Sequence, residues 1–253
     1  MKNVHIKDIV IGQGKPKICI PIVANDIEEA KKQATNIMTY PVDVIEFRAD
    51  FFDKCFDTEY TIEAIKEVNN IISVPIIYTF RTGKEGGEKE ISSDNYVNLI
   101  KKVLESGTVD LIDVEMFVGD EIVSELIKYA NEYGVKVIMS NHDFTKTPMK
   151  KELVERLVKM QKLGADIAKI AVMPNNKMDV LTLLEATVEA YEEHMDIPIV
   201  TMSMGKYGMI SRMTGEVFGS AITFGCVGKA SAPGQIEVNS LDNALNIIHR
   251  QIQ

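Results

Sequence analysis

The sequence is poor in the residues that build disulfide scaffolds, metal clusters and nucleic-acid surfaces. Its three cysteines, Cys19, Cys55 and Cys226, lie far apart and lack the paired spacing of a zinc site. A disulfide framework is therefore excluded, and a reducing cytoplasm fits this cysteine content best. Acidic residues outnumber basic ones by 37 to 28, and the resulting net charge of −9 argues against a nucleic-acid binder.

Long hydrophobic runs are also missing. No apolar stretch reaches the roughly 20 residues of a membrane helix, and the N-terminus has no charged and apolar signal pattern. The hydrophobic fraction of 45% and the charged fraction of 26% are those of an ordinary globular protein. We therefore expect a soluble, cytoplasmic protein without a membrane partner. A small anionic ligand is compatible with the net charge, because a few arginines can reverse the potential of a cleft.

Short apolar, β-branched segments recur eight times, and their starts are about 25 to 35 residues apart, the length of a strand, a helix and a return. The intervening segments are amphipathic, as in 120–133, which Gly134 ends. Eight such units predict an α/β fold, a (β/α)8 TIM barrel, over a single domain of residues 1–253. A doubly wound sheet is disfavoured because no GxGxxG motif follows the first segment. The eight predicted strands are 18–23, 42–47, 75–80, 111–117, 135–139, 165–172, 197–202 and 221–227.

The residues before the first barrel strand predict a β-hairpin. Residues 4–11 are mostly apolar, Gly12-Gln13-Gly14 can make a turn, and a second apolar run begins at Ile18. Such a hairpin can plug the N-terminal end of the barrel.

Lys169 is the most informative residue, because it interrupts the apolar run 165–172, which is typical of a buried strand. Burial disfavours the ammonium form of a lysine. A neutral buried amine attacks carbonyl groups and forms Schiff bases. His142 follows the strand before it and is the candidate proton carrier, with a core histidine as the alternative. His5, His194 and His249 are better explained as surface residues.

Further charged residues follow other strands, where a barrel carries its active site. Glu46 and Arg48 share one face of the second strand, as a site pair or as an ion pair closing the barrel mouth. Arg81 ends the third strand, and Glu85 follows in a glycine-containing loop, where it can orient His142 or simply be solvated.

Two more features complete the candidate site. Asp113 and Glu115 share one face of the fourth strand, where they can support Lys169 as ion-pair partners; the chain lacks the second histidine and further oxygen donors of a metal site. Arg212 follows the seventh strand and is suited to bind a carboxylate. The loop 228–235, with Ser231 and Gln235, can close as a lid. Met202, Met204 and Phe224 are expected to be pocket walls or core.

Together these residues resemble the type I 3-dehydroquinate dehydratase family. The resemblance covers nearly the whole chain and is most specific in Asp113-Val114-Glu115-Met116, followed after twenty residues by Val137 to Asp143. Shorter matches are Glu46-Phe47-Arg48, Thr79-Phe80-Arg81, Glu85-Gly86-Gly87, Ala168-Lys169 and Ser231-Ala232-Pro233-Gly234-Gln235.

The resemblance implies a (β/α)8 lyase that converts 3-dehydroquinate to 3-dehydroshikimate, the third step of the shikimate pathway, through an imine on Lys169. It implies that His142 moves the protons, that Glu85 orients His142, and that Arg212 binds the substrate carboxylate. It further implies a homodimer without cofactor or metal. Substrate hydroxyl and carboxylate groups would be held by Glu46, Arg48, Arg81, Ser231 and Gln235.

Two other functions remain compatible with the residues themselves. A class I Schiff-base aldolase would share the barrel and the lysine, and Gly205-Lys206-Tyr207-Gly208 and the segment from Gly225 to Gly228 would then bind a phosphate. A barrel that only binds an anionic metabolite would use Lys169 as a counter-charge and form no imine.

Overall fold

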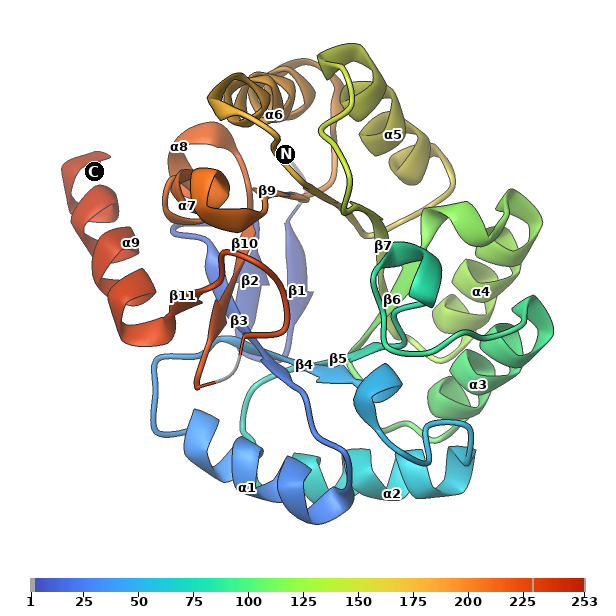
Figure 1. The fold of residues 1–253 in the computed structure, drawn as a ribbon. Helices are drawn as coiled ribbons and strands as arrows, with labels where there is room; N and C mark the ends of the chain where they lie inside the picture. The colour runs from blue at the N-terminus through green and yellow to red at the C-terminus, as the bar shows by residue number, and fades with distance from the viewer. Residues whose placement is uncertain (1–2, 229, 253) are drawn as a thin grey trace.

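The chain folds into a curled parallel sheet surrounded by helices (Figure 1), and this computed structural model describes residues 3–228 and 230–252. Lys229, part of the predicted lid loop, lies outside the described residues. The strand order is β11-β10-β3-β4-β5-β6-β7-β8-β9, and neighbouring strands in the sheet are parallel. The predicted α/β barrel with an N-terminal hairpin is confirmed. The barrel strands are β3 (Lys17–Ile22), β4 (Val44–Arg48), β5 (Ile76–Thr79), β6 (Leu111–Glu115), β7 (Lys136–Asp143), β8 (Ile167–Val172), β9 (Ile199–Ser203) and β10 (Ile222–Cys226), with β11 (Ile236–Glu237) at one edge.

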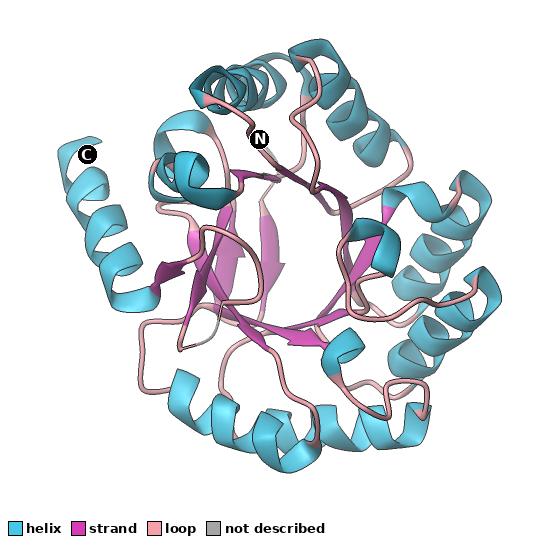
Figure 2. Ribbon diagram, viewed as in Figure 1, coloured by secondary structure: helices cyan, strands magenta, loops and turns pink. Residues whose placement is uncertain are grey.

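Helices follow the strands and form the outer ring seen in Figure 2. In α4, Val123, Leu126, Ile127 and Ala130 form the buried stripe expected from the sequence, and Gly134 follows with a φ of 70°. Short helical turns, including η1 (Ala49–Phe51) and η2 (Gly83–Glu85), lie after β4 and β5. The longer helices are α1 (Ile27–Ile37), α2 (Thr58–Asn69), α3 (Ser93–Glu105), α4 (Asp120–Glu132), α5 (Lys150–Lys162), α6 (Lys177–Glu189), α7 (Gly205–Met213) and α9 (Val238–Ile252), with the short α8 (Gly215–Phe218) between the last two.

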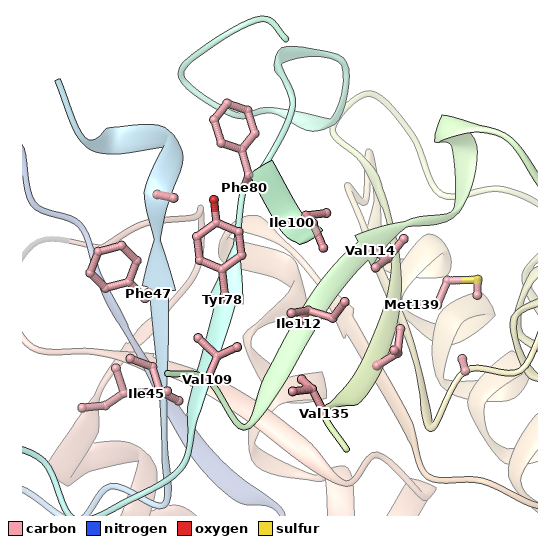
Figure 3. Packing of buried hydrophobic residues seen from close by; sticks show 14 of the residues in the cluster. Ile45, Phe47, Tyr78, Phe80, Ile100, Val109, Ile112, Val114, Val135 and Met139 are labelled. Atoms are coloured by element: carbon pink, nitrogen blue, oxygen red, sulfur yellow. The ribbon is translucent and has the colours of Figure 1, made fainter. Parts of the chain in front are cut away.

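The strands are buried on both faces, so their side chains alternate between two environments. Outward-facing residues such as Ile45, Phe47 and Ile112 pack under the helices in the larger apolar cluster (Figure 3). Inward-facing positions hold small or apolar residues near the strand starts and charged residues near the strand ends. This change along each strand divides the barrel interior into an apolar floor and a polar mouth.

The N-terminal hairpin closes the floor. Strands β1 (Val4–Ile6) and β2 (Ile9–Ile11) pair antiparallel, and Val4, Ile6 and Ile11 join the inward-facing residues of the barrel strands in one buried cluster. The turn predicted at Gly12-Gln13-Gly14 is wrong, because Ile6 pairs with Ile9 and the turn is Lys7-Asp8. Lys7 takes the left-handed φ of 47° that such a tight turn requires, and the glycines instead join β2 to β3.

Three aspartates fix the register of neighbouring strands at the floor. Each stands just before or at the start of one strand and accepts a hydrogen bond from a backbone N–H of the strand beside it. The pairs are Asp43 with Ile18 (2.8 Å), Asp110 with Ile76 (2.9 Å) and Asp166 with Val137 (2.9 Å).

The barrel closes with a seam between β9 and β10. Within the described residues these strands share no ladder; one isolated bridge joins Ile199 of β9 to Ser220, which lies two residues before β10. The N–H of Ala221 donates to the Ile199 carbonyl at 2.8 Å, and the Ser220 hydroxyl accepts from the N–H of Thr201 at 3.0 Å. Toward their carboxyl ends, β9 and β10 are therefore connected by side-chain contacts, among them those of Arg212 in α7 with Met202 and Phe224.

Candidate active site

All nine site residues expected from the sequence line one pocket at the carboxyl ends of the barrel strands. The pocket is built from β4, β5, β7, β8, the helix α7 and the loop between β10 and β11, so residues from the whole chain converge on it. Met202, Met204 and Phe224 line it as walls, as expected. The nine residues are Glu46, Arg48, Arg81, Glu85, His142, Lys169, Arg212, Ser231 and Gln235.

Lys169 projects inward from the middle of β8, and its side chain is 4% exposed. Its Nζ lies 3.2 Å from Asp113 Oδ2 and 3.6 Å from Glu46 Oε1, and it stands 4.4 Å from the centre of the Phe224 ring. The Phe224 ring packs against the amine, and the two carboxylates hold it in place. Asp113 is thus the lysine partner of the pair on β6, and the expected approach of Glu115 to Lys169 does not occur.

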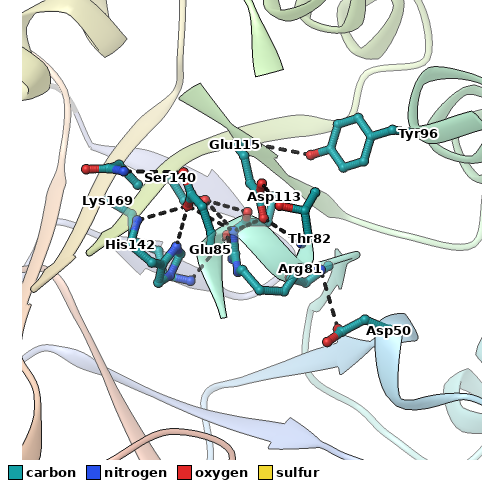
Figure 4. Close-up of polar contacts among 12 residues, drawn as sticks. Asp50, Arg81, Thr82, Glu85, Tyr96, Asp113, Glu115, Ser140, His142 and Lys169 are labelled. Atoms are coloured by element: carbon teal, nitrogen blue, oxygen red, sulfur yellow. Dashed lines mark hydrogen bonds and ion pairs between the residues drawn. The ribbon is translucent and has the colours of Figure 1, made fainter. Parts of the chain in front are cut away.

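His142 and Glu85 form a hydrogen-bonded pair (Figure 4). Glu85 Oε2 lies 2.9 Å from His142 Nδ1 and accepts from the His142 backbone N–H at 2.9 Å, while Asn141 Nδ2 donates to Oε1 at 3.3 Å. Burial, assisted by the charges of Arg81 and Lys169, holds the pKa of His142 well below its usual range. Burial also raises the pKa of Glu85 to about 8 against the opposing charge of Arg81. The imidazole is therefore neutral and able to accept a proton.

Arg81 organises the acidic groups beside this pair. Its guanidinium contacts Asp113 Oδ2 at 2.9 Å and Glu115 Oε1 at 3.0 Å, and it donates to the Ser140 hydroxyl at 2.9 Å. Burial opposes ionisation of Asp113, but the charges of Arg81 and Lys169 outweigh it and hold the Asp113 pKa well below its usual range. The carboxylate beside Lys169 is therefore ionised.

Arg48 is held by Asp50 and not by Glu46. Its Nε and Nη2 each donate to the Asp50 carboxylate at 2.8 Å, and its guanidinium lies 4.8 Å from the centre of the Phe51 ring. Glu46 instead accepts from the Thr79 hydroxyl at 3.0 Å and faces Lys169. The alternative of a Glu46–Arg48 ion pair closing the mouth is therefore not what the structure has.

Arg212 is the cation of the pocket that lacks a carboxylate partner among the described residues. It is 1% exposed, and its Nη1 and Nη2 donate to the carbonyls of Phe224 and Pro233 at 3.3 Å, while Nε is buried without a hydrogen bond. Burial lowers the pKa of Arg212 to about 10, which still leaves it charged at neutral pH. An anionic ligand group entering the pocket would satisfy it.

The loop after β10 carries Ser231 and Gln235 to the pocket edge. Gln235 donates to the Ser231 hydroxyl at 3.0 Å and accepts from the Ser231 N–H at 2.8 Å, so the two side chains hold each other. The Pro233 carbonyl accepts from the N–H of Gly205 at the start of α7. This contact occupies the Gly205 N–H, one of the groups to which a phosphate at this turn could bind.

Sequence reasoning missed three residues that support the site, because none of them stands out as a polar residue at the end of an apolar strand. Asp50 lies two residues after Arg48, Asn141 carries the hydrogen bond to Glu85, and Phe144 lines the pocket beside Gly86. Gly86 takes a φ of 82°, and a Cβ there would lie 2.3 Å from the Phe144 ring. Of these, only the i, i+2 spacing of Arg48 and Asp50 was a usable signal.

The arrangement is suited to covalent chemistry on a small, anionic carbonyl compound. A buried amine and an uncharged imidazole face one pocket from the neighbouring strands β8 and β7, and a guanidinium without a carboxylate partner among the described residues completes the walls. In residues 3–228 and 230–252, no cluster of three or more His, Cys, Asp or Glu side chains is arranged to hold a metal ion. The same residues include no helix long and apolar enough to cross a membrane.

Comparisons with known proteins agree with this geometry. The sequence model of the family described as type I 3-dehydroquinase matches residues 18–252. The 3-dehydroquinate dehydratase of Clostridioides difficile is 49% identical over 252 residues, covering 99% of each chain. That of Salmonella typhimurium is 50% identical over 251 residues, covering 99% of this chain and 100% of the relative.

Solved structures give the same result. A Clostridium difficile type I 3-dehydroquinate dehydratase with covalently modified comenic acid superposes with a TM-score of 0.96 at 49% identity, covering 99% of each chain. The Geobacillus kaustophilus enzyme superposes equally well, at 0.96 and 36% identity, over 100% of this chain and 98% of its own. A 3-hexulose-6-phosphate synthase, at 16% identity and a TM-score of 0.60, shares the fold alone.

Proposed function

The chain belongs to the type I 3-dehydroquinase family of 3-dehydroquinate dehydratases, and from this premise we propose that it dehydrates its substrate through an imine on Lys169. The observation that carries the proposal is the buried Lys169 amine, which faces the same pocket as the His142–Glu85 pair. The product is 3-dehydroshikimate, and the reaction is the third step of the shikimate pathway.

The first step joins Lys169 to the substrate. Lys169 passes one ammonium proton to a neighbouring base, and the free amine attacks the ring ketone carbon to give a carbinolamine. The carbinolamine hydroxyl takes that proton and leaves as water, so a protonated imine remains. Asp113 and Glu46, 3.2 and 3.6 Å from Nζ, hold the amine and then stabilise the positive charge of the imine. The imine draws electrons from the neighbouring carbon, so no metal or nucleotide is required.

His142 then moves the proton that the elimination requires. Its neutral imidazole removes a proton from the carbon next to the imine, and the electron pair of that bond enters the imine to give an enamine. The enamine returns its electrons and expels the hydroxyl group, which leaves as water after taking the proton from His142. Hydrolysis of the remaining imine by water releases the product and restores Lys169.

Glu85 keeps His142 in the orientation for this work. It holds Nδ1 at 2.9 Å, which leaves Nε2 for the substrate. For Nε2 to accept the substrate proton, the imidazole hydrogen has to lie on Nδ1 and be donated to Glu85, so Glu85 fixes the tautomer of His142 as well as its orientation.

The remaining pocket residues position the substrate. Arg212, buried without a carboxylate partner among the described residues, binds the substrate carboxylate. Glu46, Arg48, Arg81, Ser231 and Gln235 bind hydroxyl and carboxylate oxygens. Holding the reacting carbon next to His142 in this way supplies much of the rate advantage of a bound substrate.

The comparison with the Clostridium difficile enzyme supports covalent chemistry. That structure is described as containing covalently modified comenic acid, a compound held in a protein 49% identical to this one. A class I aldolase is less well supported, because the family model and the relatives that match nearly the whole chain are 3-dehydroquinases.

Borohydride trapping tests the proposal. The protein is incubated with 3-dehydroquinate and reduced, and the added mass is located by peptide mass spectrometry, while a parallel sample without reductant is followed by enone absorbance. We expect an adduct on Lys169 and rising absorbance. An adduct without absorbance growth would indicate another Schiff-base enzyme, and neither signal from folded protein would leave only a metabolite-binding barrel.

We further propose that the protein is a single-domain homodimer located in the cytoplasm. These statements are supported by the family resemblance and by the cysteine content, and the dimer can be checked by sedimentation equilibrium at micromolar concentration. A monomer mass would contradict it.

A further inference from the structure

We propose that Asp50 is a positioning residue that couples substrate binding at Arg48 to proton transfer at the Glu85–His142 pair. It does not line the pocket, and it is fully buried in the short turn η1 that follows β4. The inference deepens the proposed function and rests on it, because it assumes that Arg48 contacts the substrate and that Glu85 orients His142.

The first arm of the argument concerns Arg48. Asp50 accepts from Nε and Nη2, both at 2.8 Å, in a two-point contact that fixes the plane of the guanidinium as well as its position. The Phe51 ring, 4.8 Å away, supports one face of that plane. Nη1 is not engaged by Asp50, so its two N–H groups can be presented to a substrate oxygen. Asp50 therefore decides where Arg48 presents its free donor.

The second arm concerns the loop that carries Glu85. Asp50 Oδ1 accepts from the N–H of Arg81 at 3.4 Å, and Oδ2 accepts from the N–H of Glu88 at 3.2 Å. These two amides stand at the beginning and the end of the segment 81–88, so one carboxylate holds both ends of the loop. The Arg81 contact is drawn in Figure 4.

The loop is tight enough to transmit a displacement of its base. Gly87 N–H donates to the Thr82 carbonyl at 2.8 Å, Gly83 N–H donates to the Lys89 carbonyl at 3.1 Å, and a Cβ on Gly87 would lie 1.9 Å from the Arg81 carbonyl oxygen. The Glu85 side chain projects from this loop toward His142. A displacement of the backbone at Glu88 or Arg81 therefore moves the Glu85 carboxylate as well, because the hydrogen bonds leave the loop little conformational freedom.

The charge of Asp50 is needed for both arms. The carboxylate is 0% exposed and receives four donors, so all of its hydrogen bonding is spent on Arg48 and on the loop. An asparagine at this position keeps one acceptor oxygen but places an NH₂ group where the other oxygen stood. That NH₂ group faces two N–H donors, one from Arg48 and one from the loop, and both hydrogen bonds are lost. Arg48 and the loop would then both relax.

The test compares Asp50→Asn with wild type in steady-state dehydration. Active sites are counted by borohydride trapping on Lys169, so that misfolded protein does not enter the rates. We expect KM to rise about tenfold through Arg48, and kcat to fall about tenfold, since misplacement by a fraction of an ångström at the reacting groups has effects of this order. The acid limb of the kcat profile should move to higher pH, because a loosened loop admits water to His142. Arg81, Glu115 and Asp113, which also face Glu85, are unchanged in this variant.

Asp43→Asn is the matched control, because Asp43 also accepts a backbone N–H beside a barrel strand but lies at the floor. It should lower the melting temperature and leave KM and the pH profile as they are. If Asp50→Asn behaves like this control, or changes only KM or only the pH profile, the proposed coupling is wrong.

Asp50→Glu provides a second test if the asparagine variant does not fold. It keeps the charge but shifts the oxygens by one methylene, and both KM and the acid limb should still move. Unchanged values in this variant would likewise overturn the proposal. Absence of a Lys169 adduct in wild type would instead count against the imine mechanism, and the KM and pH comparisons would still report on Asp50.

Discussion

Replacing Arg212 by methionine should make the protein more stable and almost inactive. The side chain is 1% exposed, has a buried Nε without a partner, and contacts two carbonyls only at 3.3 Å. Methionine has a similar length and no charge to desolvate, so the fold loses little packing. We therefore expect the guanidinium to serve substrate binding and not the stability of the folded structure.

The magnitude follows from the burial. The fall of the Arg212 pKa from 12.5 to about 10 corresponds to a cost of about 3 kcal/mol for keeping the charge inside. The two long hydrogen bonds return roughly 0.5 to 1 kcal/mol each. Arg212→Met should therefore raise the free energy of unfolding by about 1 to 2 kcal/mol, and the melting temperature by roughly 3 to 6 °C.

The activity should change in the opposite direction. Removing one partner of a buried charge pair costs about 3 kcal/mol or more in binding, on the order of a hundredfold in kcat/KM. Thermal unfolding and enone absorbance measure the two effects on the same sample, and Arg250→Met, at an exposed arginine of α9, is the control. A less stable variant with unchanged kcat/KM would refute the reasoning, because Arg212 would then serve the fold.

Three further outcomes are expected. Lys169→Met should abolish turnover and borohydride labelling while calorimetry still detects binding of the substrate; residual adduct would place the imine elsewhere. Because His142 must be neutral to accept a proton and burial holds its pKa well below the usual value, the acid limb of kcat that reports on His142 should lie below pH 6.5, and an acid limb of His142 above 6.5 would contradict this. Ile11→Ala should cost about 2 to 5 kcal/mol of stability in denaturant unfolding, with kcat/KM unchanged, since Ile11 is fully buried in the floor.

The barrel and most of the pocket were predictable because both follow from strand periodicity. Eight apolar segments place their last inward residues at one end of the barrel, and β7 and β8 pair with Ser140 opposite Lys169, which brings His142 near the amine. Any polar residue at those positions had to face the same cavity. The convergence of Glu46, Arg81 and Lys169 needed no knowledge of loop structure.

The contacts made by loops and by carboxylates were not predictable in the same way. Nothing in the sequence distinguishes Asp113, which contacts Lys169, from Glu115, which contacts Arg81 and Thr82, because both occupy inward positions of β6. Arg212 lies in α7, whose apolar pattern is weak, so its burial was not evident. The hairpin turn was misplaced because glycines are a stronger turn signal than Lys7-Asp8.

The seam between β9 and β10 has a consequence for the dynamics of the barrel. Because one bridge stands in place of a ladder, we expect the amides there to open at a lower free energy than those between β7 and β8, which pair along six residues. Arg212 lies beside this seam, donating to the Phe224 carbonyl of β10 and lying 3.5 Å from Met202 Sδ of β9. An anion bound to Arg212 should therefore fix this guanidinium and stabilise the contact between the two strands. Hydrogen–deuterium exchange at 199–203 and 222–226 should slow on ligand binding more than exchange in β7 or β8. The exchange rates of these backbone amides would then report whether the pocket is occupied.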